Sequence, residues 1–141
     1  MKYRLDKDKI FITLSRGDEI VECLSEVAIK EKLESGWVLG IGAMEDVEVG
    51  YFDFPTRSYQ NQSFDGEFEL LSLSGNITLK DDVPFVHPHV TFSGPDFKVL
   101  GGHLFNGTIS AAGEFVILRG NITIPRTMDD HIKLALWNLE D

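Results

Sequence analysis

The sequence has one cysteine, no long apolar run and few basic residues. A single cysteine, Cys23, cannot form an internal disulfide, which excludes the small secreted folds that depend on several bridges. No stretch approaches the ~20 apolar residues of a membrane-spanning helix, and residues 1–8 lack the apolar segment of a secretory signal. We therefore expect a soluble protein of the reducing cytoplasm that has no membrane partner.

Positive charge is scarce and scattered. The chain has 13 Lys and Arg against 23 Asp and Glu, which gives a formal net charge of -10. Non-specific attraction to phosphate backbones depends on clustered basic side chains. The densest basic stretch, residues 2–9, is interrupted by Asp6 and Asp8, so direct binding to nucleic acid is not expected.

Several catalytic motifs are also missing. The sequence has no Gly-x-Ser-x-Gly elbow, phosphate-binding loop or Cys-x-x-Cys pair. Residues 40–43 (Gly-Ile-Gly-Ala) lack the spacing of a dinucleotide fingerprint, and we expect these glycines to allow close strand packing instead. The common nucleotide, redox and serine-hydrolase classes therefore have no support.

What the chain does have is enough apolar material for one core. It has 141 residues, of which 43% are hydrophobic, and its ten phenylalanines are spread along the whole length. This length falls within the range of one domain. We expect a single domain over residues 1–141 that needs no disulfides.

The apolar pattern predicts one helix and many strands. Helical spacing from Ile20 to Leu33 predicts the helix, with Asp18 as its cap and Gly36 as its stop signal. From Trp37 onward, short β-type runs separated by Gly, Asp, Asn and Pro are typical of antiparallel sheets. The polar residues 56–65 predict a mobile loop that borders the candidate site. The predicted strands are 9–14, 37–43, 47–53, 67–74, 85–93, 97–100, 103–111, 114–118 and 131–139, the last with a short helix as the alternative.

Three histidines lie in β-forming sequence: His87 and His89 around Pro88, and His103 after a Gly-Gly pair. Because side chains alternate along a strand, His87 and His89 project from one side, and a neighbouring strand would bring His103 beside them. Pro88 lacks a ladder donor, which predicts an edge strand or a locally unpaired position where ring nitrogens stay accessible. Three neutral imidazoles suit Zn²⁺ with one position left open.

The residues alone leave two interpretations of these histidines: a metal site, or imidazoles that only hydrogen-bond across strands or at a subunit interface. His131 lies outside the pattern and is expected on the surface or in a loop. Catalysis would also need an acid or base, and Glu67, Glu69 and Glu114 lie in strand-like runs. Alternation puts Glu67 and Glu69 on one face, where a simple cross-strand ion pair is the alternative role.

Four blocks of the sequence resemble a known family. They are residues 40–43, residues 66–76 (Gly-Glu-Phe-Glu-Leu-Leu-Ser-Leu-Ser-Gly-Asn), residues 87–90 (His-Pro-His-Val) and residues 101–104 (Gly-Gly-His-Leu). Their order and spacing are similar to the plants-and-prokaryotes-conserved (PPC) domain, also called the DUF296 or PD1-like domain. The resemblance implies an α+β fold with a curved, mostly antiparallel β-sheet of the sandwich or half-barrel kind, one main flanking helix, and assembly as a homotrimer.

The resemblance also separates two kinds of relative. Plant members follow AT-hook motifs that bind A·T-rich DNA, and this chain has no hook, since residues 16–18 (Arg-Gly-Asp) carry an acid where a hook needs its second arginine. Stand-alone prokaryotic members often keep all three histidines, so the resemblance implies zinc binding by His87, His89 and His103. Glu69 matches a recurrent family position and is the first candidate for a carboxylate that orients a histidine.

Three functions follow from these patterns. The leading hypothesis is a cytoplasmic homotrimer that binds a divalent metal, zinc, with a small anionic or carbonyl ligand completing the shell. The second is a DNA-associated or regulatory assembly module, in which the metal is structural or incidental. The third is a metal-dependent hydrolase or lyase, which differs from simple binding by loss of turnover when any of the three histidines is replaced.

Overall fold

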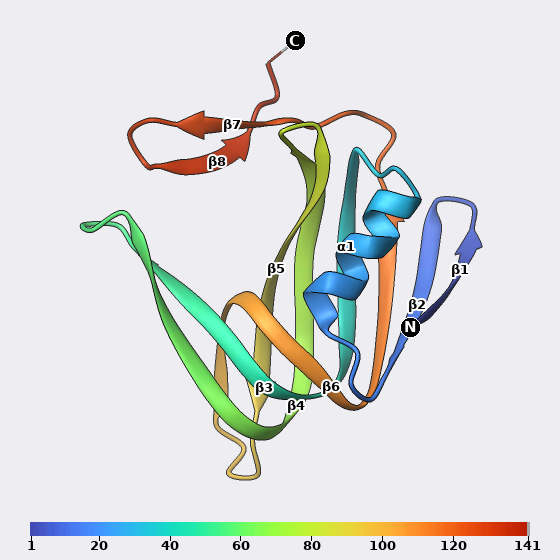
Figure 1. The fold of residues 1–141 in the computed structure, drawn as a ribbon, viewed down its shortest axis with the longest axis vertical. Coiled ribbons are helices and arrows are strands. Elements are labelled where there is room, and N and C mark those ends of the chain that lie inside the picture. The colour runs from blue at the N-terminus through green and yellow to red at the C-terminus, as the bar shows by residue number, and fades with distance from the viewer. Residues whose placement is uncertain (141) are drawn as a thin grey trace.

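The computed structural model describes residues 1–140. It contains one helix and mostly antiparallel strands, which confirms the predicted α+β class with a curved sheet and one main flanking helix. Figure 1 shows the arrangement. The elements are β1 Lys2–Asp6, β2 Lys9–Ser15, α1 Ile20–Lys30, β3 Ser35–Asp53, β4 Ser58–Lys80, β5 Val83–Ser93, β6 Val99–Arg119, β7 Arg126–Asp129 and β8 Leu134–Trp137.

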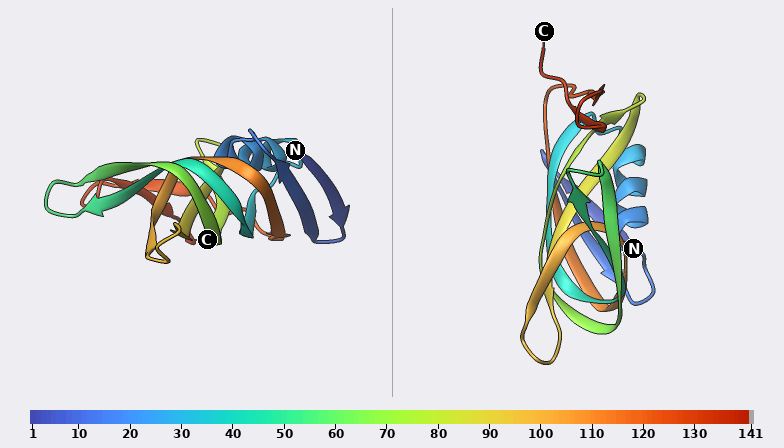
Figure 2. Two further views of the ribbon diagram at one scale, coloured as in Figure 1. Left: turned by 90° about the horizontal axis from the view of Figure 1, so that it is seen from below. Right: turned by 90° about the vertical axis from the view of Figure 1, so that its left-hand side faces the viewer.

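Six strands form one antiparallel sheet in the order β1-β2-β6-β3-β4-β5. The sheet also curls until β5 pairs with β6 over residues 89–93 and 99–103, so β5 has β4 on one side and β6 on the other. Figure 2 shows the sheet as a curved layer with α1 on one side of it. This curl brings the histidine-bearing segments of β5 and β6 together.

Two of the long strands, β3 and β6, are continuous where the sequence pattern predicted separate pieces. Residues 37–43 and 47–53 belong to the single strand β3, and residues 103–111 and 114–118 belong to β6. Register shifts between Gly40 and Gly42 and between Glu45 and Val47 bend β3 without ending it. The apparent breaks in the sequence are therefore bulges.

The predicted loop at residues 56–65 is wrong. Residues 54–57 form a tight turn, and β4 begins at Ser58. The polar side chains from Ser58 to Ser63 pair as strand residues with the end of β3 and point mostly to solvent. Most side chains of this part of β4 are polar and exposed, so its composition is the same as that of a loop, which explains the error.

The helix α1 buries Ile20, Leu24, Val27 and Ala28 against the sheet. Its N-cap is Glu19, whose side chain accepts from the Glu22 N–H, so the predicted cap, residue 18, is wrong by one position. Asp18 instead accepts a hydrogen bond from the backbone N–H of Ser15 and pairs with the chain's amino terminus. These contacts hold the segment that leads into the helix.

The helix ends at Lys30, so the prediction that Gly36 ends it is also wrong. Gly36 lies in β3, where a Cβ atom would sit 3.0 Å from the Leu118 carbonyl oxygen. Glycine at this position permits close strand approach rather than ending a helix.

Between the sheet and α1 lies a core made of aliphatic side chains together with Met44, Phe92 and Phe115. Its largest fully buried members include Ile10, Leu14, Leu73 and Ile77. Alternation along β2 and β4 sends these residues inward and their neighbours outward, as the pattern predicts. Among the described residues, no helix is long and apolar enough to cross a membrane.

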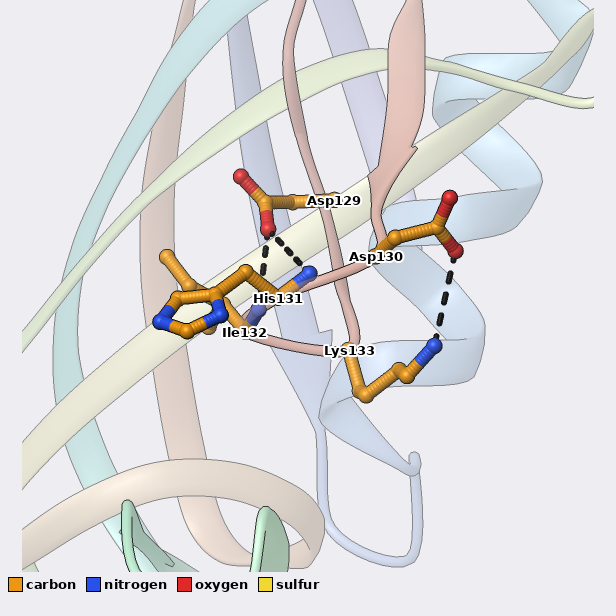
Figure 3. A network of polar contacts seen from close by, with 5 residues as sticks. All are labelled: Asp129, Asp130, His131, Ile132 and Lys133. Carbon is orange, nitrogen blue, oxygen red and sulfur yellow. Dashed lines mark hydrogen bonds and ion pairs between the residues drawn. The ribbon is translucent and has the colours of Figure 1, made fainter.

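The chain ends in a separate hairpin, β7 with β8, beside the end of β4 (Figure 1). The predicted terminal strand at residues 131–139 is confirmed in its central part, as β8. The turn between β7 and β8 is held by Asp129, whose carboxylate accepts hydrogen bonds from the backbone N–H groups of His131 and Ile132 (Figure 3). Asp130 and Lys133 form an ion pair across the same turn. The hairpin covers one end of the cavity described next.

Candidate metal centre

The three histidines come from two paired strands. His87 and His89 lie two residues apart on β5, and His103 on β6 is the register partner of His89. Pairing of β5 with β6 stops at His89, so Pro88 needs no donor toward β6. Pro88 is the register partner of Gly75 on β4, so the locally unpaired position that it predicts is found on the β6 side alone.

The ring nitrogens of His87, His89 and His103 converge. One ligand atom from each lies within 4.8 Å of the others, and the Nε2 atoms of His87 and His89 are 3.3 Å apart. The ring centroids of His103 lie 4.9 Å from His87 and 5.4 Å from His89. The chain folds so that three imidazoles share one small volume.

The surroundings hold two of these imidazoles in the neutral form. Burial, followed by the charges of His103, Arg126 and His89, lowers the pKa of His87 from 6.5 to about 4. Burial, followed by the charges of His89 and Arg126, lowers the pKa of His103 to about 4 as well. A neutral imidazole has the free lone pair that a metal ion requires.

The donor set fits a zinc ion. Zinc accepts imidazole nitrogen, and three histidine ligands with a fourth position open is a known catalytic arrangement of this metal. The Nδ1 atom of His103 is buried and has no hydrogen-bond partner among the described residues. A buried polar atom without a partner is unfavourable, so the site is incomplete with protein atoms alone.

Glycines let the strands approach beside the histidines. A Cβ atom on Gly101 would lie 2.4 Å from the Val90 carbonyl oxygen, and one on Gly75 would lie 2.5 Å from the His87 carbonyl oxygen. Atoms this close would force the strands apart. The Gly-Gly-His block therefore supports the close approach that its sequence predicts.

A cavity of about 370 Å³ opens beside two of the histidines. Tyr59 and Phe105 pack on His103, with ring centroids 5.1 Å and 4.6 Å away. Burial raises the pKa of the Tyr59 phenol. The cavity is lined by Val21, Tyr59, Lys80, Phe85, Val86, His87, Pro88, His103, Leu104, Phe105, Arg126, Leu134, Ala135 and Leu136, none of them acidic.

The sequence pattern missed Arg126, which lies half-buried against this cavity. Its Nε atom donates to the Thr78 hydroxyl, and its terminal nitrogens donate to the Asn76 side-chain oxygen and the Ala135 carbonyl, each at 2.7 Å. One terminal nitrogen also lies 3.4 Å from Nδ1 of His87. Arg126 belongs to no motif. The sequence marks it only weakly, as the one Lys or Arg between Arg119 and Lys133.

The predicted acidic residues lie elsewhere. Glu67 and Glu69 are exposed on one face of β4, as alternation predicts, and Glu69 pairs in register with Ser93, while Ser74 pairs with His89. Neither acid hydrogen-bonds to a histidine in the described chain, and both line a separate depression. Glu114 lies in the exposed part of β6 that pairs with β2 and β3. His131 lies in the β7–β8 turn (Figure 3).

Known structures share this fold over almost the full chain. A Bacteroides thetaiotaomicron protein, provisionally described as DNA-binding, matches with a TM-score of 0.96 at 28% identity, over 99% of this chain and 98% of its own. A plant- and prokaryote-conserved protein of Pyrococcus horikoshii matches with a TM-score of 0.87 at 31% identity, over 99% and 96%. A metal-containing protein of Archaeoglobus fulgidus matches with a TM-score of 0.86 at 31% identity, over 97% and 96%.

No curated protein matches the sequence. The family model described as the Plants and Prokaryotes Conserved domain, abbreviated PCC or PPC, matches residues 1–121. This match spans β1 to β6 and all three clustered histidines, and the motif blocks of the sequence predicted it. The chain therefore belongs to the Plants and Prokaryotes Conserved domain family.

Proposed function

We propose that this chain is a single-domain, cytoplasmic, homotrimeric protein that binds one zinc ion through His87, His89 and His103. A small anionic or carbonyl ligand would complete the coordination of the metal. The observation that carries the proposal is the convergence of the three ring nitrogens within 4.8 Å of one another. Neutral imidazoles and a buried, unpartnered Nδ1 on His103 support it.

The comparison with known structures adds independent support. The Archaeoglobus fulgidus relative is described as metal-containing and is 31% identical to this chain. Zinc held by three imidazoles supplies a Lewis acid with an open position, which attracts oxygen ligands that carry negative charge or a carbonyl dipole. Binding of such a ligand does not by itself require catalysis.

The homotrimer is supported by an apolar patch on the sheet face that points away from α1. Phe11 on β2, Leu39 and Ile41 on β3, and Leu118 on β6 are between 39% and 56% exposed. Phe11 and Leu39 are both register partners of Val116, so they share one face across three strands. Large apolar patches of this kind mark interaction surfaces, and further copies of this chain would cover it.

Light scattering tests the assembly. Wild-type protein at micromolar concentration should have three times the mass of the chain, and the Ile41→Lys variant should be smaller because a buried charge opposes association. Phe97→Lys is a matched control, since Phe97 is 86% exposed and lies outside this patch. A wild-type monomer under these conditions would contradict the trimer.

Zinc titration of chelator-treated protein by calorimetry tests the metal site. Wild-type protein should bind about one zinc per chain, and His103→Ala should remove stoichiometric binding because it deletes one of three ligands. His131→Ala should bind zinc as the wild type does, because His131 is not in the cluster. Equal binding by all three proteins would reject the site.

A DNA-associated assembly module is the second candidate function. It is favoured by the Bacteroides thetaiotaomicron relative, which is provisionally described as DNA-binding and is 28% identical. The net charge of -10 opposes direct contact with phosphate. A mobility-shift assay at low salt should detect no complex. A complex that weakens steeply with salt would instead favour this second function.

A further inference from the structure

The cavity beside the histidines has an unusual charge for this chain. Two basic residues, Lys80 and Arg126, line it, and no aspartate or glutamate does. Acidic residues outnumber basic ones 23 to 13 in the whole sequence, so a wall without acids is not what the composition would give at random. The electrostatic potential of this cavity favours an anion.

Arg126 is held by neutral groups only. Its acceptors are the Thr78 hydroxyl, the Asn76 amide oxygen and the Ala135 carbonyl, and no carboxylate pairs with it among the described residues. Half-buried guanidinium groups are usually compensated by an acid, because removing a charge from water is unfavourable. The positive charge of Arg126 therefore has no protein counterion.

Both cations lie over one aromatic ring. The Arg126 guanidinium carbon is 5.1 Å from the centre of the Phe85 ring, and the Lys80 Nζ atom is 5.4 Å from it. The ring attracts each cation but cannot neutralise either of them. An anion in the cavity would relieve the repulsion between these two like charges.

We propose that this cavity binds a small organic acid, whose carboxylate pairs with Arg126 and Lys80 while its apolar body lies against Phe85, Phe105 and Leu134. The inference rests on the proposed function, because the other end of the ligand would face the metal held by the histidines. It goes beyond that function by naming the group that is recognised and the two residues that recognise it.

The cavity wall explains why the ligand needs an apolar body. Aromatic rings and aliphatic side chains from β5, β6 and β8 make up most of the lining. Its volume of about 370 Å³ falls in the range of small-molecule sites, where a few charged groups fix orientation and apolar walls supply contact area. A free inorganic anion would leave most of this wall without contacts.

A carboxylate fits the available donors better than a phosphate does. Three N–H groups of Arg126 already donate to Thr78, Asn76 and Ala135, so few remain for a ligand. A carboxylate carries one charge and is satisfied by few donors, whereas a phosphate group carries more charge and needs more of them.

Part of this recognition lies outside the family model. The model ends at residue 121, whereas Arg126 and the hairpin residues Leu134–Leu136 follow it. Structural relatives cover the hairpin as well, since they match up to 99% of the chain.

Calorimetric binding of benzoate and benzamide tests the inference. The two probes have the same size and apolar ring, and only benzoate carries a charge. Zinc-loaded wild-type protein should bind benzoate at least tenfold more tightly than benzamide. Arg126→Gln should weaken benzoate binding by roughly ten- to a hundredfold, which is the usual range for losing a charge-assisted hydrogen bond.

Because Arg126 also donates to the Ala135 carbonyl of the hairpin, a second variant that leaves this contact intact is needed. Lys80→Met removes a charge that makes no hydrogen bond in the described chain, and it should weaken benzoate binding several-fold with the fold intact. Lys98→Gln is the matched control, because Lys98 is a distant, 82% exposed cation, and it should bind benzoate as the wild type does. Tryptophan fluorescence reports whether the hairpin is in place, because Trp137 in β8 packs edge-to-face on Trp37 in β3, with ring centroids 6.5 Å apart.

Two outcomes would overturn the inference. One is benzoate binding that is unchanged in both Arg126→Gln and Lys80→Met. The other is wild-type protein that binds benzamide or phenyl phosphate at least as tightly as benzoate. Zinc content measured in the same samples separates this failure from failure of the metal site: protein that takes up no zinc when zinc is supplied, yet binds benzoate in a way that Arg126→Gln weakens, would refute the zinc proposal alone.

Discussion

Two regions of the β4–β5 pair use the same strand geometry for opposite chemistry: the histidine end, which lies nearer the turn that joins the two strands, and the acidic end, where the pairing finishes at Glu69 and Ser93. At one end, Asn76 and Ser74 pair with His87 and His89, and the cavity beside them has basic residues and no acids. At the other end, Glu69 pairs with Ser93, and the depression around it is lined by acids with no histidine. Only four residues of β4 lie between Glu69 and Ser74, so register alone decides which chemistry each end receives.

Burial distinguishes the two ends further. The histidine end is partly buried, and burial lowers the pKa of both His87 and His103 to about 4. The carboxylates of the acidic end are exposed to water, where charged groups are well solvated. Only the first environment prepares side chains to bind a ligand, because His87 and His103 are partly withdrawn from water and the Nδ1 atom of His103 has no hydrogen-bond partner in the described chain.

The ends also differ in what holds them. Beneath the acidic end, Phe64, Phe68 and Phe92 form a cluster of edge-to-face rings with centroids 5.2 to 6.4 Å apart. At the histidine end, the Nδ1 atom of His103 finds no hydrogen-bond partner within residues 1–140. The acidic end is thus stabilised by apolar packing, whereas the histidine end gives up some stability that a bound metal would restore.

Phe92→Ala should have the largest effect on stability. Phe92 is fully buried, and removing its ring should lower the free energy of unfolding by about 3–5 kcal/mol, measured by denaturant unfolding. Zinc titration of the folded variant should still give about one ion per chain. A loss below ~1 kcal/mol would contradict the packing role given to Phe92. Loss of zinc from folded protein would mean that the two ends are not independent.

Gly101→Ala should have an intermediate effect, at the histidine end. Its Cβ would lie 2.4 Å from the Val90 carbonyl oxygen, so β5 and β6 must separate next to His103. We expect a loss of about 1–3 kcal/mol in unfolding free energy together with weaker zinc binding. Gly107→Ala in the same strand is the control, because its Cβ would meet side chains only at 3.5 Å or more. Equal zinc affinity in both variants would contradict the account.

The double change Glu67→Gln and Glu69→Gln should have the smallest effect. Both side chains are exposed and make no hydrogen bond in the described chain, so the free energy of unfolding should change by less than ~0.5 kcal/mol. Zinc affinity measured by calorimetry should also be unchanged. A tenfold fall in zinc affinity would show that these acids act on the metal site, as expected if Glu69 orients one of the histidines.

The sequence predicted the core of the candidate site because that part depends on local periodicity. His87 and His89 share a side since strand side chains alternate, and the glycines before His103 permit the approach of β5. The family blocks predicted the fold class and the family. These properties are encoded over a few neighbouring residues and need no knowledge of distant contacts.

The sequence did not reveal what depends on distant pairing. Arg126 reaches the cavity only because its hairpin folds over β4, and no local pattern marks it. Tyr59 was placed in a predicted loop, yet it lies in β4 and packs on His103. The bulges in β3 were predicted as strand ends, because the residues at a β-bulge and those at a turn have similar composition.

Metal analysis of the purified protein tests the central claim most directly. Protein prepared without a histidine tag or chelator should contain about one zinc per chain by elemental mass spectrometry. The double change His87→Ala and His89→Ala should lose this zinc while the assembly measured by light scattering is kept, and His131→Ala should retain it. Zinc that persists in the double variant, or no metal in wild-type protein, would contradict the account.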